Sequence, residues 1–263
     1  MKKFFVVGNP IKHSLSPKLQ NYWIKKYNID AVYDKKLIEK KDIKTIIEEI
    51  KNNNIRGINV TVPFKNIFTT MVDELSFIAK QTQSVNTIYK KGNKIIGDNT
   101  DAGGFESALR HINYNTKGKK ALILGSGGVV PSIILSLENS GINQITLSNR
   151  TREKAENLKK KFKNIEILDW GNIVDFDIVI NATSLGLNKE DKIDLNFSNL
   201  KNKLFYDVIY NPPMTNFLLA GQEYGNQLEN GKMMFIYQAQ LAFNAWHNIL
   251  PEIDKETIEL LEQ

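Results

Sequence analysis

The chain has 263 residues, a formal net charge of +6, and hydrophobic and charged fractions of 41% and 24%, which are ordinary for a folded globular protein with one or two cores. There is no cysteine, which excludes disulfides and thiolate ligands, and the three histidines (His13, His111 and His247) lack metal-ligand spacing, so we predict no metal. No apolar run approaches the roughly 20 residues of a membrane span. Lysines are spread between glutamates, so the positive charge does not indicate a nucleic-acid partner. We expect a cytoplasmic protein with neither membrane nor nucleic-acid partners.

Strand and helix patterns alternate along the chain, which predicts an α/β fold. In the first part we expect strands at 2–7, 31–37 and 57–62, helices at 16–27 and 42–52, short helices at 64–71 and 75–79, and a hairpin of 85–89 with 94–97. Ser16 is expected to cap the first helix, with Pro17 at its first position.

A second unit is expected to start near residue 102, because a strand–helix–strand pattern begins again at 119. We expect strands at 119–124, 145–148, 165–168, 178–181 and 204–207, and helices at 102–112, 129–140, 151–162, 233–250 and after 254. Neither an internal repeat nor a low-complexity linker marks the boundary.

Two polar segments follow apolar strands. The first, NVTVPFK (59–65), ends in Pro63 and delivers Lys65 just past a strand, because proline cannot continue a central ladder. The second, GDNTDAGGF (97–105), carries Asp98 and Asp101. A lysine held by an aspartate at strand ends can act as an ammonium general acid. Either segment alone is weak evidence, because a lysine after a strand is more often a solvated cap, and Asp98 is expected to be structural.

A glycine-rich turn, GSGG (125–128), joins a buried strand to an apolar helix. Glycines let the backbone approach a pyrophosphate, whose charge is stabilised at a helix N-terminus. The third glycine of the usual dinucleotide-binding spacing is missing, so the turn alone leaves this function open.

The end of the next strand indicates which dinucleotide would bind. An acidic residue there usually holds the ribose hydroxyls of NAD, whereas this chain has Asn149 and Arg150, followed by Arg152 and Lys154. A guanidinium can pair with a 2′-phosphate. These residues favour NADP over NAD.

The ordered motifs of the chain resemble those of the shikimate dehydrogenase family over nearly the whole length. They are GNPIKHSLSP (8–17), NVTVPFK (59–65), QSVNTI (83–88), GDNTDAGGF (97–105), GSGG (125–128), NRT (149–151), NATSLG (181–186), DVIYNPPMT (207–215) and GKMMFIYQAQLAF (231–243).

The resemblance implies an oxidoreductase with two domains. Residues 1–101, joined by C-terminal helices in 231–263, would bind the substrate, and residues 102–230 would form a Rossmann-like, doubly wound NADP-binding domain. The implied reaction is the reversible NADPH-dependent reduction of 3-dehydroshikimate to shikimate, in the pathway to the aromatic amino acids. The chain would act on small molecules as a monomer or homodimer.

The same resemblance implies the site residues. Lys65 and Asp101 would be catalytic, without a decision between them as the group that transfers the proton. The substrate would be bound by Ser14, Ser16, Asn59, Thr61, Asn86, Tyr210 and Gln238. The cofactor would be bound by Gly125, Ser126, Gly127, Gly128, Val129, Asn149, Arg150, Thr151, Lys154, Thr183, Val208 and Gly231. Lys154 departs from the arginine frequent in the family, and Arg152 is an extra cation that could compensate.

Three alternatives remain at this point. An enzyme of the same fold could use NAD with quinate as well as shikimate, although Asn149 and Arg150 argue against it. The chain could be a non-catalytic NADP-sensing module, since fold alone does not fix function. Nucleic-acid binding would rest on net charge only.

Overall fold

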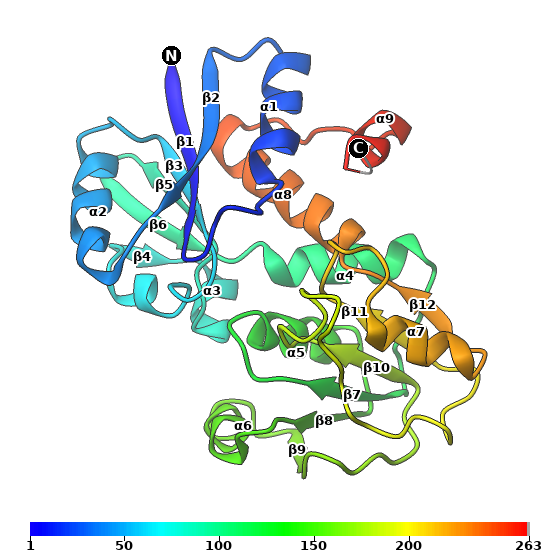
Figure 1. Cartoon of the computed structure of the whole chain (residues 1–263). Coiled ribbons are helices and arrows are strands. Elements are labelled where there is room, and N and C mark those ends of the chain that lie inside the picture. Colours follow the sequence, from blue (N-terminus) through cyan, green and yellow to red (C-terminus); the bar gives the residue numbers. More distant parts are fainter. Residues whose placement is uncertain (262–263) are drawn as a thin grey trace. The chain divides into compact units, whose positions relative to one another are not determined.

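The computed structural model describes residues 1–261, which divide into two compact units (Figure 1). The first unit contains Met1–Gly104 and the segment from Ile236 onward, and the second contains Phe105–Phe235. The divisions fall inside helices α4 (Asp101–His111) and α8 (Lys232–His247), a few residues beyond the boundaries expected at 101 and 230.

The first unit is built on a mixed sheet of six strands in the order β2-β1-β3-β5-β6-β4. Strand β5 runs antiparallel to both its neighbours, β3 and β6, and the other pairs are parallel. The strands are β1 (Lys2–Gly8), β2 (Ala31–Leu37), β3 (Gly57–Val60), β4 (Glu74–Leu75), β5 (Thr87–Lys91) and β6 (Lys94–Asp98). The helices are α1 (Ser16–Lys26), α2 (Ile43–Lys51), α3 (Phe77–Thr82) and α9 (Lys255–Glu259), with 3-10 turns η1 (Lys40–Asp42) and η2 (Ile67–Thr70).

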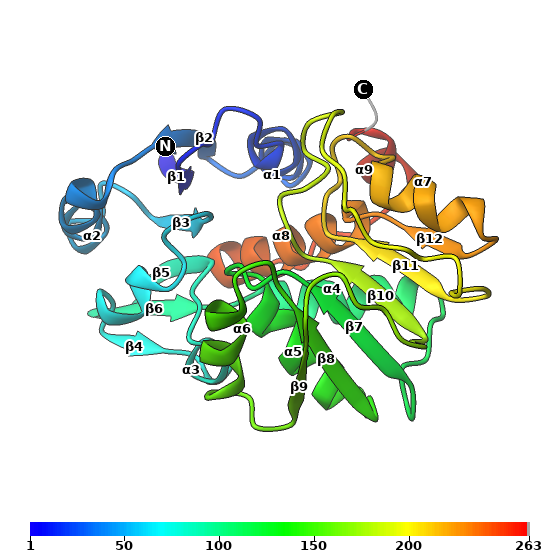
Figure 2. The same ribbon diagram turned by 60° about the horizontal axis from the view of Figure 1, so that its bottom comes forward.

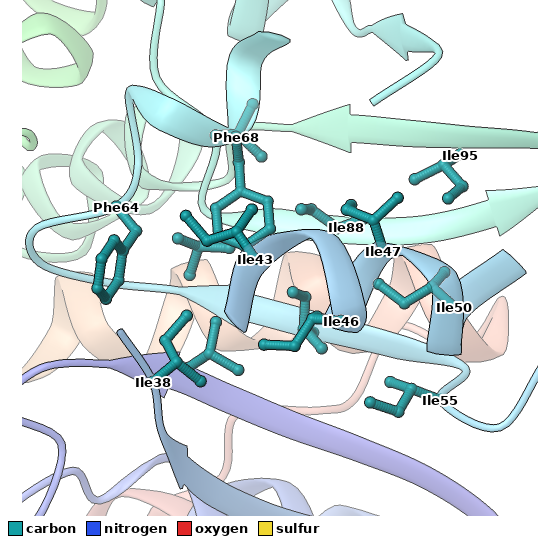
Figure 3. Close-up of a cluster of buried hydrophobic side chains, with 14 of the residues drawn as sticks. Ile38, Ile43, Ile46, Ile47, Ile50, Ile55, Phe64, Phe68, Ile88 and Ile95 are labelled. Carbon is teal, nitrogen blue, oxygen red and sulfur yellow. The ribbon is translucent and has the colours of Figure 1, made fainter. Parts of the chain in front are cut away.

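Helix α2 covers one face of this sheet because its isoleucines recur at helical spacing. Ile43, Ile46, Ile47 and Ile50 are all buried, and they pack with Ile58, Ile88 and Ile95 of the strands (Figure 3). On the opposite face, Trp246 of α8 packs against Phe4 of β1, with 5.1 Å between ring centroids. The sheet is therefore covered by helices on both sides.

The second unit is built on six parallel strands in the order β12-β11-β10-β7-β8-β9 (Figure 2). Counted along the chain from β7, this is the doubly wound order 3-2-1-4-5-6 reversed end to end, with the order changing direction between β7 and β10. The strands are β7 (Lys120–Leu124), β8 (Gln144–Ser148), β9 (Ile165–Leu168), β10 (Ile178–Asn181), β11 (Leu204–Asp207) and β12 (Gln227–Glu229). The helices within this unit are α5 (Val130–Asn139), α6 (Arg152–Lys159) and α7 (Asn216–Glu223).

The central strands of this sheet are mostly apolar, as expected for a parallel sheet buried on both faces, and their polar residues lie at strand ends. Phe205 of β11 packs with Phe197 and Phe217 on one face. The next residue, Tyr206, points to the other face and meets the ring of Phe105 from α4 edge-on.

The α/β class and two-domain organisation are confirmed, and most expected elements occur within two residues of their predicted bounds. The helix expected at 64–71 is only the short turn η2, and the helix expected at 75–79 starts at Phe77 because Leu75 belongs to β4. Ser16 is not the cap of α1, because it lies inside the helix and Leu15 holds the N-cap position. The short strands β4 and β12 and helix α7 were not predicted.

None of the helices within residues 1–261 has the length and apolar character needed to cross a bilayer.

The packing of α2 gives a stability prediction. Ile50 is fully buried, so Ile50→Ala should lower the free energy of unfolding by about 2–5 kcal/mol through lost burial and a residual cavity. Lys44→Ala, on the exposed face of the same helix, should change it by less than about 0.5 kcal/mol. Urea unfolding of both variants tests this, and equal effects would contradict the packing described for α2.

A second prediction concerns His247, whose ring lies 4.9 Å from that of Phe4 and 4.4 Å from that of Phe243. Burial lowers the pKa of His247 to about 4, and the Lys2 ammonium acts in the same direction. Between pH 6.5 and about 4 the unfolded chain therefore binds a proton that the folded chain does not. The free energy of unfolding should fall by up to about 3 kcal/mol as pH decreases through this window.

His247→Gln should reduce this pH dependence, whereas His111→Gln, at an exposed position, should leave it as in the parent chain. Denaturant unfolding at a series of pH values measures the difference. A pH profile unchanged by His247→Gln would show that this ring is not the group responsible.

Candidate active site

Lys65 and Asp101 form a close, largely buried ion pair in the first unit. Their charged atoms, Nζ and Oδ2, lie 2.5 Å apart, and the two side chains are 12% and 7% exposed. An ammonium group has three N–H donors, and within residues 1–261 only one of them is used, by Asp101. The pair thus combines a fixed carboxylate with an ammonium that still has hydrogens to donate.

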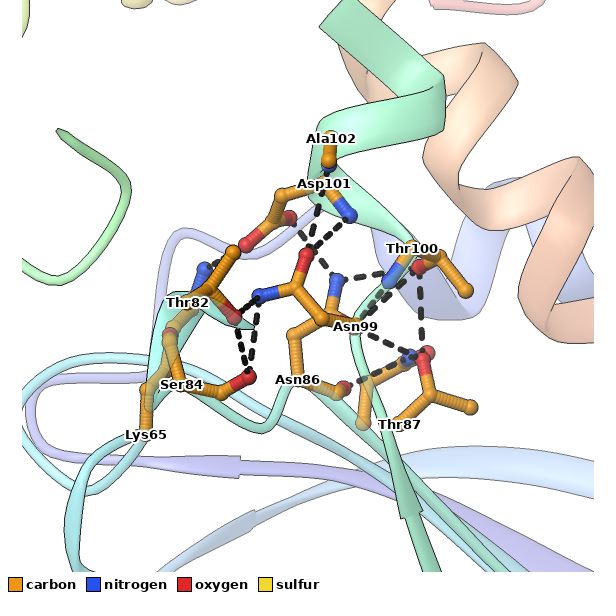
Figure 4. A network of polar contacts seen from close by, with 10 residues as sticks. Lys65, Thr82, Ser84, Asn86, Thr87, Asn99, Thr100, Asp101 and Ala102 are labelled. Atoms are coloured by element: carbon orange, nitrogen blue, oxygen red, sulfur yellow. Dashed lines mark hydrogen bonds and ion pairs between the residues drawn. The ribbon is translucent and has the colours of Figure 1, made fainter. Parts of the chain in front are cut away.

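Asn86, at the start of the β5 segment, fixes the other oxygen of Asp101 (Figure 4). Its Nδ2 donates to Asp101 Oδ1 at 2.8 Å and to Thr100 Oγ1 at 3.0 Å, and its Oδ1 accepts from the Thr100 backbone N–H. Asn99 caps the start of α4 by accepting from the backbone N–H groups of Asp101 and Ala102. The carboxylate is therefore held from both sides.

The hydrogen bonds continue from Asn86 to Ser16, at the start of α1, and to Ser14, just before that helix. Asn59 donates to the Asn86 carbonyl and to Thr87 Oγ1, both at 3.1 Å, and accepts from the Tyr33 hydroxyl at 2.8 Å. Tyr33 is fully buried, which raises its pKa well above the usual range, and a hydrogen bond with Ser16 opposes that shift. Ser14 extends this series of hydrogen bonds, because its Oγ lies 3.2 Å from Ser16 Oγ. The structure thus brings together Lys65, Asp101, Asn86, Asn59, Ser16 and Ser14.

The remaining predicted substrate residues lie on other segments. Thr61 directly follows β3, and its methyl group approaches β1 so closely that a Cβ on Gly8 would lie 2.4 Å from it. Gln238 is half-buried on α8. Tyr210 belongs to the second unit, where its ring stacks on Phe235 with 4.5 Å between centroids.

In the second unit, the predicted cofactor residues all follow the carboxyl ends of strands in the parallel sheet. Gly125 follows β7 with φ +111°, and a Cβ there would lie 2.8 Å from the Ala182 carbonyl. The turn therefore requires glycine, both for its backbone conformation and for the contact with the end of β10. Ser126, Gly127, Gly128 and Val129 lead from it to the N-terminus of α5, where orphan backbone N–H groups can hold an anion.

The cations after β8 differ in their partners. Arg152 is paired with Glu156 and Asp169. Arg150 and Lys154 are exposed and form no ion pair within residues 1–261. Asn149 donates to the carbonyl of Thr151 at 2.8 Å, which shapes the turn that presents Arg150. The two unpaired cations, rather than Arg152, are thus available for a phosphate.

Beyond the switch point, Thr183 and Val208 follow β10 and β11. The Thr183 hydroxyl donates to Asn181 Oδ1 at 2.7 Å, and the Val208 N–H donates to the Asn181 carbonyl at 3.0 Å. Gly231 lies against Val208 so closely that a Cβ would come within 2.1 Å of the Val208 carbonyl oxygen. The backbone at position 231 can therefore lie this close to Val208 only because Gly231 has no side chain.

Sequence reasoning missed the residues that connect and support these sites. Tyr33 lies in an ordinary strand pattern, and only its partners across the sheet show that it links Ser16 to Asn59. Asp207 is fully buried at the end of β11, and burial raises its pKa to about 6. A single acid at the end of an apolar strand was the available signal.

No group of three or more histidine, cysteine, aspartate or glutamate side chains within residues 1–261 could hold a metal ion.

The glycine turn and the strand order place the second unit among the dinucleotide-binding folds of dehydrogenases. Comparison with known proteins makes the assignment specific. Residues 6–88 match the model of the shikimate dehydrogenase substrate binding domain, and residues 106–208 match the model of shikimate/quinate 5-dehydrogenase.

Whole-length relatives agree with these matches. A protein of Pelagibacter ubique named shikimate dehydrogenase (NADP(+)) is 58% identical over 262 residues, which cover 99% of each chain. The crystal structure of shikimate dehydrogenase from Aquifex aeolicus is 33% identical, with a TM-score of 0.92 over 100% of this chain and 98% of that one. That of shikimate 5-dehydrogenase from Thermus thermophilus, in complex with NADP(H) and shikimate, is 27% identical, with a TM-score of 0.90 over 100% and 99%. The chain belongs to the shikimate dehydrogenase family.

Proposed function

We propose that the chain catalyses the reversible NADPH-dependent reduction of 3-dehydroshikimate to shikimate. Relatives that align over the whole chain are named as the NADP-dependent enzyme, and a structural neighbour was solved with both NADP(H) and shikimate. The alternatives of an NAD-dependent quinate enzyme and of a sensing module are not favoured by these names.

The buried pair of Lys65 and Asp101 is the observation that carries the proposal. Reduction of a ketone requires a hydride at carbon and a proton at oxygen, and bound NADPH supplies the hydride. The Lys65 ammonium donates the proton to the ketone oxygen, and in the reverse direction the neutral amine takes it back. Asp101 keeps the Lys65 ammonium oriented through their hydrogen bond.

We propose that the hydrogen-bonded side chains between Asn86 and Ser14 bind the rest of the substrate. Ser14 and Ser16 would offer hydroxyl donors to its carboxylate. Asn86 contacts Asp101, and Asn59 contacts Asn86, so we assign both asparagines to the ring hydroxyls. We assign Thr61, Gln238 and Tyr210 to the same task. Buried polar groups of this kind discriminate strongly against analogues that leave them unpaired.

The second unit is proposed to bind NADP. Gly125 to Val129 would hold the pyrophosphate at the start of α5, and Arg150 and Lys154, with Asn149 and Thr151, would bind the 2′-phosphate. Thr183, Val208 and Gly231 would receive the nicotinamide. The required glycines at 125 and 231 fit such a close approach of a ligand to the backbone.

The direct test follows absorbance of the reduced nicotinamide with purified protein, shikimate or quinate, and NADP⁺ or NAD⁺. Rapid reduction of NADP⁺ with shikimate is expected, with much slower reaction for NAD⁺ or quinate. An absence of turnover despite NADPH binding would refute the proposed reaction.

Removal of the proton donor gives the sharpest prediction. Lys65→Ala should lower kcat by about 10²–10⁴, because general acid catalysis contributes that much. The Kd for NADPH should stay within about twofold, since Lys65 lies in the other unit. Lys94→Ala, at an exposed lysine of the same sheet, is the control and should leave both quantities unchanged. Retention of kcat within about tenfold by Lys65→Ala would exclude it as the acid.

Cofactor selectivity gives another prediction. Arg150→Ala should raise KM for NADP⁺ by about 10- to 100-fold, because a charged hydrogen bond to the 2′-phosphate is lost, and leave KM for NAD⁺ nearly unchanged. Arg152→Ala is a matched control, because its guanidinium is already paired with Glu156 and Asp169. Steady-state kinetics with both cofactors tests this, and a larger effect of Arg152→Ala would reverse the assignment.

A further inference from the structure

A buried polar cluster joins the ends of β10 and β11 and has no part in the functions assigned above. Its members are Asn181, Asp207 and Thr215, with side chains that are 0%, 0% and 2% exposed. Asn181 and Asp207 are direct neighbours in the parallel register, and each ends its strand. The cluster therefore lies at the edge of the sheet where ligands of doubly wound folds bind.

Within residues 1–261, the Asp207 carboxylate is surrounded by hydrogen-bond donors. Oδ1 accepts from the Ile209 N–H at 2.9 Å, Oδ2 accepts from the Thr215 hydroxyl at 2.6 Å, and Asn181 Nδ2 lies 3.1 Å from both oxygens. An ionised carboxylate accepts at all of these positions, whereas a protonated acid or an amide does not. With a pKa of about 6, the group is ionised at neutral pH.

The carboxylate fixes which way the Asn181 amide faces. Because Nδ2 points to Asp207 and also donates to the Leu185 carbonyl at 3.0 Å, Oδ1 points the other way. There it accepts from the backbone N–H of Thr183 at 3.1 Å and from its hydroxyl at 2.7 Å. The Thr183 hydroxyl in turn accepts from the Leu185 N–H at 3.0 Å. The loop 182–186 is thus shaped through a single amide whose orientation depends on Asp207.

This loop lies on one defined side of the dinucleotide site. The turn at Gly125 touches the Ala182 carbonyl, so the pyrophosphate position adjoins the end of β10. The cations for the 2′-phosphate follow β8, on the other side of β7 from β10. A dinucleotide that spans the switch point places its two halves on opposite sides, so the loop after β10 faces the nicotinamide half.

We propose that Asp207 is a positioning residue that selectively supports binding of the nicotinamide half of the cofactor. It acts through Asn181, which holds Thr183, and through Thr215, which also caps α7 and against which Gly186 of the loop packs. The inference rests on the proposed NADP-dependent function and adds a residue that touches neither cofactor nor substrate.

Substitution of the Asp207 carboxylate by an amide should disrupt the hydrogen bonds that connect it, through Asn181, to Thr183. In Asp207→Asn, one acceptor becomes a donor and faces the donors of Thr215 and Asn181. The Asn181 Nδ2 group then no longer faces two acceptor oxygens at position 207. If it turns over, it presents Nδ2 to the Thr183 N–H, so two donors meet and the loop shifts. Within residues 1–261, none of the hydrogen bonds of Asn181, Asp207 and Thr215 involves the segment after β8 that carries Arg150 and Lys154.

The experiment compares two ligands on Asp207→Asn. NADPH contains both halves, whereas 2′,5′-ADP contains the adenosine half with its 2′-phosphate and no nicotinamide. Equilibrium binding should show NADPH weakened by about tenfold or more, and 2′,5′-ADP unchanged within about twofold. KM for NADP⁺ should rise correspondingly, with KM for shikimate little changed.

Matched variants separate positioning from general damage. Asp177→Asn removes a carboxylate that accepts from the Lys120 N–H beside the other end of β10, and both affinities should stay as in the parent chain. Thr215→Val removes the hydroxyl donor and should weaken binding of NADPH but not of 2′,5′-ADP. Thr215→Ser keeps the hydroxyl, and both affinities should stay as in the parent chain. If Asp207→Asn does not fold, comparison of the two Thr215 variants still tests the proposal.

Equal loss of both ligands, or unchanged NADPH binding, in Asp207→Asn and Thr215→Val would overturn the inference. Those outcomes differ from failure of the proposed function. That failure would appear in the parent chain, as an absence of NADPH binding or of turnover with shikimate.

Discussion

The ion pair between Lys65 and Asp101 is the interaction on which the first unit depends. The two residues are 36 positions apart, and they meet only because β5 lies between β3 and β6 and carries Asn86 to the same edge. A buried charge is tolerable only when it is paired and hydrogen-bonded. The sheet order and the capped start of α4 supply both conditions. The mixed sheet therefore brings these two charged side chains together in a largely buried position.

The buried carboxylates of Asp101 and Asp207 show how burial and hydrogen-bond partners decide what such a group can do. Within residues 1–261 the Lys65 ammonium that faces Asp101 makes only this one hydrogen bond, which supports our proposal that the pair exchanges a proton with the substrate. Asp207 is surrounded by donors from three segments and has no exposed atom, so it can only hold its neighbours in place. Both lie at strand or helix ends, where a polar side chain leaves the apolar interior of the sheet.

The strands and the longer helices were predictable because their apolar spacing is dictated by the burial of one or two faces. The isoleucines of α2 and the apolar runs of β7 and β10 are examples. Two-residue strands such as β4 have too few residues to show a period, and α7 follows two prolines without a clear apolar stripe. The prediction of a helix at 64–71 was wrong. Phe64 and Phe68 are buried in the same core as the isoleucines of α2, but this segment forms only a short turn, so their helical spacing reflects tertiary packing.

The candidate site residues could be predicted as single positions, but their connections could not. From the sequence we expected Arg150 and Lys154 to bind the phosphate, and Arg152 was an extra cation that could compensate for Lys154. The structure distinguishes them, because Asp169 comes from the end of the neighbouring strand β9 and pairs with Arg152. An exposed pair of this kind contributes little to stability. The pair instead affects phosphate binding, because the Arg152 guanidinium must release its carboxylate partners before it can bind a phosphate. Long-range pairing therefore decides which of several similar charges can recognise a ligand.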